Sequence, residues 1–192
     1  EPFGTARIQY STPADGRESM KRQLDLARAL AGETFQMGDA NVHVDAWCSE
    51  PDDLLVYRMS SDAPIDVNIS VAGTFLKQSR ASLEAVSEGH RATLIVMGRM
   101  PGLNVGLLPH PSEHPWEDEQ DGTGMAYAGA FSLTATGGGI NVGDNSLQCS
   151  NITGLSLRFR SISGFKGSDQ QPERSMTVIA DHLEKTIDEW ST

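Results

Sequence analysis

Alternating hydrophobic and polar positions run along much of this chain in short segments. Val42, Val44 and Ala46 alternate with polar residues, and Ile65–Val71 repeats the same period of two. Successive side chains of a strand point to opposite faces, so this alternation predicts strands with one wet face. The run Thr93–Met97 is continuously apolar, which predicts a strand buried on both faces.

Turn-forming residues separate these segments. Gly38–Asn41 predicts a hairpin turn, Ser49–Asp53 closes a segment before the apolar strand Leu54–Met59, and Gly137–Gly139 predicts a further turn. Leu155–Phe159 is the last alternating strand. About five to seven such segments predict an antiparallel β-sandwich rather than alternating strands and helices.

The C-terminal part follows a different period. Between Glu173 and Trp190, apolar residues recur every three or four positions, which predicts an amphipathic helix with Pro172 in its first turn. The stripe consists of Met176, Ile179, Leu183, Ile187 and Trp190. Such a stripe must be buried either on the sandwich or on another domain, and the sequence leaves both possibilities open.

Composition excludes several classes of partner. The net charge of −11 disfavours nucleic acid and anionic membranes, because both are bound through Lys and Arg. A length of 192 residues suits one domain, and no window approaches the roughly 20 apolar residues of a membrane span. Cys48 and Cys149 lack metal-ligand spacing, and we expect buried free thiols, although a disulfide stays possible. The cellular compartment is left open.

The densest polar cluster lies in a Gly- and Pro-rich segment between Gly98 and Gly124. His110, His114 and neighbouring acids could bind a metal, but the intervening prolines prevent the helical presentation that paired metal-binding histidines use. We therefore expect a solvated loop and no metal or cofactor. The glycine runs lack the lysine and the strand–loop–helix setting of a phosphate-binding loop. Asp52 and Asp53 are interpreted as turn residues, so no catalytic residue is assigned.

A series of motifs resembles the N-terminal β-sandwich domain of glycoside hydrolase family 95, the α-L-fucosidases and their relatives. The series covers residues 1–170 in order, with Tyr127 where that family usually has Phe. Its members are Pro2–Gly4, Arg22–Leu26, Ser49–Asp52, Ala92–Pro101, Asp121–Ala128, Gly138–Ile140, Ser150–Asn151, Leu155–Leu157 and Ser161–Gly167.

The resemblance implies an all-β fold, an antiparallel β-sandwich of the super-sandwich type with a C-terminal amphipathic linker helix. The sandwich domain is expected over residues 1–170 and the linker helix over 171–192. Relatives carry further strands before this segment and continue into an (α/α)6 catalytic barrel. We therefore expect a domain truncated at both ends, with that barrel of the same parent protein as its partner.

The expected function is that of a non-catalytic N-terminal domain, which packs on the barrel and shapes its entrance. The parent reaction implied by the resemblance is hydrolysis of terminal α-L-fucosides with inversion, and the chain alone is expected to be inactive. The loop that would rim the entrance carries Arg99, His110, His114 and Trp116. The alternative is a free-standing carbohydrate- or protein-binding sandwich, which exposed aromatic residues on one face would favour.

Overall fold

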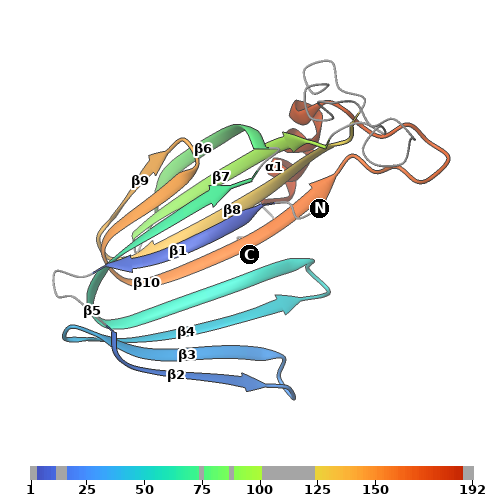
Figure 1. Cartoon of the computed structure of the whole chain (residues 1–192). Coiled ribbons are helices and arrows are strands. Elements are labelled where there is room, and N and C mark those ends of the chain that lie inside the picture. The colour runs from blue at the N-terminus through green and yellow to red at the C-terminus, as the bar shows by residue number, and fades with distance from the viewer. Residues whose placement is uncertain (1–3, 12–16, 74–75, 87–88, 101–123, 188–192) are drawn as a thin grey trace, which may run out of the picture.

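The computed structural model describes residues 4–11, 17–73, 76–86, 89–100 and 124–187, which form strands and a C-terminal helix (Figure 1). The all-β sandwich expected from the alternation is confirmed. The elements are β1 (Thr5–Ser11), β2 (Arg17–Asp25), β3 (Leu30–Met37), β4 (Ala40–Ser49), β5 (Leu54–Ala72), β6 (Leu76–Val86), β7 (Gly89–Arg99), β8 (Ala126–Thr136), β9 (Gly139–Gly143), β10 (Ser146–Ser163) and α1 (Met176–Ile187).

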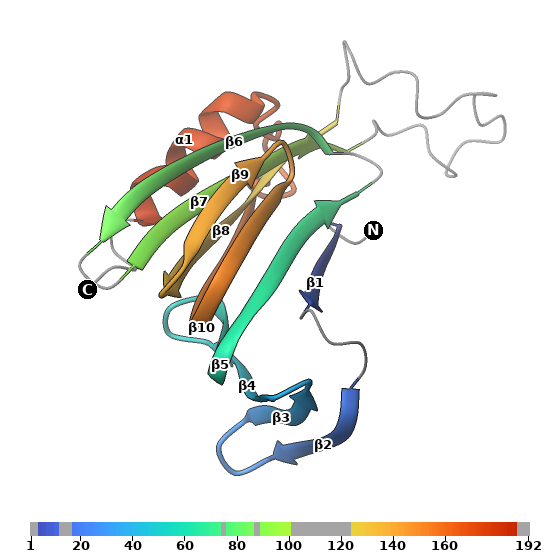
Figure 2. The same cartoon turned by 90° about the vertical axis from the view of Figure 1, so that its left-hand side faces the viewer.

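In the described residues every strand pair is antiparallel, and the strands belong to one hydrogen-bonded sheet that folds over into two layers (Figures 1 and 2). The larger layer has the order β2-β3-β4-β5-β10-β8-β7-β6. The long strands β5 and β10 continue into the smaller layer, where β5 pairs with β1 and β10 pairs with β9. Two strands that cross between the layers therefore hold the sandwich together.

The core between the layers follows the predicted alternation. Ile65, Val67, Ile69 and Val71 of β5 are all buried, while the residues between them are half-buried or exposed. In the smaller layer Ile69 pairs with Leu147 of β10, so the apolar faces of both strands point inward together. Burial of such side chains provides the main stabilising term, about 1.5–3 kcal/mol for each large aliphatic residue.

The sequence predicted Leu54–Met59 and Ile65–Val71 as separate strands, but β5 contains both. The pairing of β5 with β10 is irregular where the sheet bends, with register shifts on both sides of Ile152. Pro64 lies in this irregular part of β5, where its missing N–H costs no ladder hydrogen bond. A proline that would end an ordinary central strand is thus accommodated at the bend.

The helix α1 begins at Met176 and not near Pro172, where the sequence placed its first turn. Ser175 caps it, because the Ser175 Oγ accepts a hydrogen bond from the Val178 N–H at 3.3 Å. The helix is described as far as Ile187, and the predicted stripe residue Trp190 lies outside the described residues.

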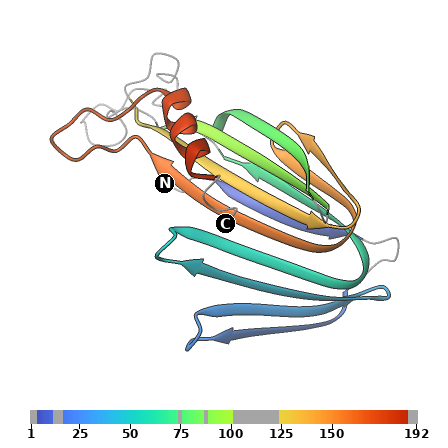
Figure 3. The same cartoon turned by 180° about the vertical axis from the view of Figure 1, so that it is seen from behind.

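The structure decides between the two possible surfaces on which the helical stripe could be buried, the sandwich or another domain. Ile179, Ala180, Leu183 and Ile187 are buried against the larger layer, on its side away from the core (Figure 3). We call this side of the larger layer the outer face. The helix therefore packs on the sandwich itself, chiefly across β8 and also on β7 and β10.

Candidate functional site: the outer face beside the helix

Small residues on β8 form the seat of the helix. Ala126, Ala128 and Ala130 point to the outer face and are fully buried, and Ile95 and Met97 of β7 complete the seat. A row of methyl groups leaves space for α1 to approach the sheet closely. The prediction that Thr93–Met97 is buried on both faces is confirmed for its apolar residues, because Leu94 and Val96 face the core while Ile95 and Met97 face α1.

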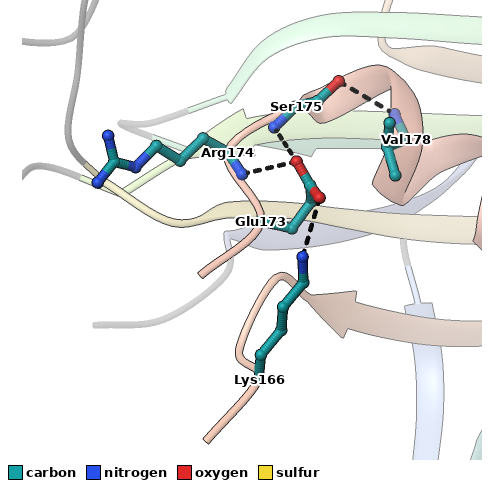
Figure 4. Close-up of polar contacts among 5 residues, drawn as sticks. All are labelled: Lys166, Glu173, Arg174, Ser175 and Val178. Carbon is teal, nitrogen blue, oxygen red and sulfur yellow. Dashed lines mark hydrogen bonds and ion pairs between the residues drawn. The ribbon is translucent and has the colours of Figure 1, made fainter. Parts of the chain in front are cut away.

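Glu173 joins the segment before α1 to the sheet through its main chain and holds that segment through its carboxylate, whose contacts Figure 4 shows. Its main-chain N–H donates to the Gly164 carbonyl at 2.8 Å, and its carbonyl accepts from the Ala126 N–H at 3.0 Å. Its carboxylate accepts from the main-chain N–H groups of Arg174 and Ser175, each at 3.0 Å, and from the Lys166 Nζ at 3.1 Å. These contacts, first the Ser175 N–H and then Lys166, lower the pKa of Glu173.

Arg99 is the one predicted site residue that the structure describes. Its Nη2 donates to the Arg174 carbonyl at 2.6 Å, so it holds the same segment before α1. Its Nε is buried and has no hydrogen-bond partner among the described residues. The other residues of the predicted entrance loop, His110, His114 and Trp116, lie outside the described residues.

An outward-facing hollow lies next to the helix seat. It has a volume of about 550 Å³ and a floor formed by Leu54 and Val56, which also belong to the buried cluster under α1. We call it the arginine hollow, because three arginines line it. Its charged and aromatic lining residues are Trp47, Asp52, Asp53, Arg58, Arg158 and Arg160.

The arginines differ in what they contact. The Arg58 guanidinium lies 5.1 Å from the centroid of the Trp47 ring, which is a cation–π contact. The Nε of Arg160 lies 3.3 Å from the Oδ2 of Asp53, whose side chain is 73% exposed. Arg158 makes no ion pair or hydrogen bond with the part of the chain that the structure describes. The hollow therefore carries more positive than negative charge.

Sequence reasoning missed this hollow, although a signal was present. Arg58 continues the outward positions of the predicted strand Leu54–Met59, and Arg158 and Arg160 are two positions apart around Phe159. Period two places all three on one face only if the two strands pair, which the sequence did not show. The interpretation of Asp52 and Asp53 as turn residues agrees with the structure, and Asp53 also pairs with Arg160.

The described residues contain no candidate metal site and two free cysteines. No group of three or more His, Cys, Asp or Glu side chains there is placed to hold a metal ion. Both cysteines are free thiols, but only Cys149 is buried as expected, and burial raises its pKa to about 11. Cys48 is exposed because it lies at the end of β4. No helix in the described part is long and apolar enough to cross a membrane.

Comparison with known proteins gives a family match and a fold match. The family described as "Glycosyl hydrolase family 65, N-terminal domain" matches residues 1–168. A solved structure described as "Putative kojibiose phosphorylase from human microbiome" has a TM-score of 0.52 at 10% identity. That match covers 96% of this chain but only 25% of the other protein. No curated protein matches. These findings support a glycoside hydrolase N-terminal domain, and they give no support to family 95 in particular.

Proposed function

Because the chain belongs to the glycosyl hydrolase family 65 N-terminal domain family, we propose that it is the non-catalytic companion of a catalytic domain in a glycoside hydrolase or phosphorylase. The family match over residues 1–168 carries this proposal. The chain also spans only about a quarter of the length of the phosphorylase whose fold it shares. In this arrangement the sandwich packs on the catalytic domain, and α1 belongs to the connection between the two.

The described carboxylates support a non-catalytic role. Glycoside hydrolysis uses one carboxylic acid with a raised pKa beside a second, ionised carboxylate. The described carboxyl groups with a resolved shift are Asp25, Asp62 and Glu173, and hydrogen bonds lower the pKa in each case. A lowered pKa keeps a carboxylate ionised, which suits a cap or an ion pair and not a general acid.

Two parent reactions follow from different observations. The family description and the fold match favour cleavage of an α-glucoside, with phosphate or water as the acceptor. The motif series of the sequence favours hydrolysis of an α-L-fucoside. The full-length enzyme should be assayed on kojibiose with and without phosphate, and on an aryl α-L-fucoside, with the present chain assayed in parallel.

We expect turnover by the full-length enzyme and none by the present chain. Phosphate-dependent cleavage of kojibiose would assign the α-glucoside reaction, and release of fucose would assign the other. Turnover by the present chain would refute the companion role. A full-length protein without glycosidase or phosphorylase activity, in which the chain itself binds sugars, would instead indicate a free-standing carbohydrate-binding module.

The entrance loop stays part of the proposal. Arg99 ends β7 directly before the segment with His110, His114 and Trp116, and loops that leave a rigid sheet are frequent sites of function. Replacing the two histidines and Trp116 with alanine in the full-length enzyme should raise KM for the substrate while the melting temperature of the sandwich is kept. Unchanged kinetics would refute a role of this loop at the entrance.

A further inference from the structure

We propose that the arginine hollow is a docking site for an acidic segment of the catalytic domain, which inserts Asp or Glu side chains among the three arginines. The proposal rests on the proposed function, because that function supplies the catalytic domain. It goes further by naming the surface of the sandwich that is used and the chemistry of what it receives.

The pairing of two strands concentrates the positive charge. Arg158 lies directly opposite Val56, and Arg58 lies opposite Ser156, so the two arginines are diagonal neighbours on the same face. Arg160 follows on that face of β10. Diagonal neighbours of a sheet lie roughly 7–8 Å apart, within reach of long side chains, so the two positive charges are close enough to repel each other. Such a cluster of three arginines is unexpected in a chain whose net charge is −11.

Carboxylates of the sandwich neutralise this charge only in part. Asp52 and Asp53 line the hollow with the three arginines, and Asp52 accepts a hydrogen bond from the Ser49 Oγ. Asp45 lies directly opposite Arg58, yet its Oδ2 lies 3.1 Å from the His43 Nε2, while Arg58 turns onto Trp47. Asp53 reaches only Arg160. Guanidinium groups bind carboxylates through two parallel hydrogen bonds, and that capacity is unused at Arg58 and Arg158 within the described residues.

The position of the hollow favours the catalytic domain over a free anion as its occupant. Leu54 and Val56 of the floor share a buried cluster with Ile187, the last residue of α1. The floor of the hollow thus belongs to the same buried cluster as the helix that, in the proposed function, connects the domains. A segment tethered in the same polypeptide has an effective concentration of about millimolar for a short linker. At that concentration, even weak charge-assisted contacts between the tethered segment and the arginines form.

Zero-length cross-linking in the full-length enzyme tests this assignment. Arg158→Lys keeps the positive charge and introduces an amine that a carbodiimide couples to a carboxylate in direct contact. We expect a cross-link from position 158 to an Asp or Glu of the catalytic domain. The matched control is Arg22→Lys on β2, an exposed position beside Glu33, which should link only within the sandwich. A position 158 that links only within the sandwich would overturn the proposal.

A stability comparison gives a second, independent readout. In the present chain, replacing Arg58 and Arg158 with alanine should leave the melting temperature nearly unchanged, because relief of repulsion offsets the loss of the cation–π contact between Arg58 and Trp47. The same pair of changes in the full-length enzyme should increase the rate of proteolytic cleavage between the domains by about tenfold, which corresponds to about 1.4 kcal/mol.

Equal cleavage rates in variant and wild-type enzyme would overturn the proposal. So would saturable binding of inorganic sulfate to the hollow in the full-length enzyme, since it would show the hollow to be open to small anions there. Absence of any catalytic domain from the full-length protein would instead refute the proposed function, so the two failures are distinguishable.

Discussion

Gly164 and Glu173 are in direct main-chain contact, because the Glu173 N–H donates to the Gly164 carbonyl at 2.8 Å. The contact leaves no room for a side chain. A Cβ at position 164 would lie 2.2 Å from the Glu173 carbonyl oxygen. The end of β10 and the segment before α1 therefore meet at a position where only glycine, which has no Cβ, fits.

Gly164→Ala should consequently destabilise the chain by about 1–3 kcal/mol, because the backbone of the Glu173 segment must move to relieve the overlap. Urea unfolding followed by circular dichroism measures the change. Gly139→Ala is the matched control, since a Cβ there meets nothing within 4 Å. Equal stability of the two variants would show that the contact is unimportant.

Leu183→Ala should lower the free energy of unfolding by about 2–5 kcal/mol, because it removes a fully buried side chain from the helix seat and leaves a cavity. Val178→Ala, on the exposed side of α1, should change it by less than about 0.5 kcal/mol. Chemical denaturation of both variants checks this difference. A small effect of Leu183→Ala would mean that the helix is not docked on β8 in solution.

The contribution of Glu173 to stability should depend on pH. Its folded pKa is lowered from the ordinary value of 4.5, so its stabilising effect is complete above that value and is lost as the pH falls through the folded pKa. The difference in stability between the wild type and Glu173→Gln should therefore shrink below about pH 4.5. Stability curves that stay parallel down to pH 3 would contradict the role of its ionised form.

Arg99→Ala should reduce the stability of the present chain by about 1–2 kcal/mol, because it removes the charged donor to the Arg174 carbonyl. Thermal unfolding measures this effect. The control is Arg80→Ala, whose ion pairs with Asp181 and Glu184 are solvent-exposed and should contribute at most about 1 kcal/mol. An Arg99→Ala variant as stable as the wild type would contradict a stabilising role of this hydrogen bond. The proposed entrance of the catalytic domain would then remain as the place where Arg99 acts.

Local patterns predicted much of the fold. Period-two alternation identified the buried side of Ile65–Val71. The continuously apolar run Thr93–Met97 indicated a strand that is covered on both faces, as the core and α1 cover it in the structure. Glycine at positive φ explains why the turn at Gly137 was readable, since few other residues adopt that conformation. These features depend on neighbouring residues only.

Features that depend on distant pairing were not predictable. The continuity of β5 through Pro64 depends on the bend of the sheet, and the predicted Pro172 start of the helix failed because Glu173 and Ser175 hold the preceding segment extended. The arginine hollow requires the register that places Arg158 opposite Val56. A register between strands about 100 residues apart along the chain leaves no local trace in the sequence.

The intact mass of the native polypeptide in its source tests the companion-domain role most directly. The chain has a mass of 20.7 kDa and covers 25% of the solved protein whose fold it shares. We predict a native mass several-fold larger, with a catalytic domain after the sandwich. A native polypeptide of 20.7 kDa would contradict this role, and sugar-binding screens on the chain itself would then be needed.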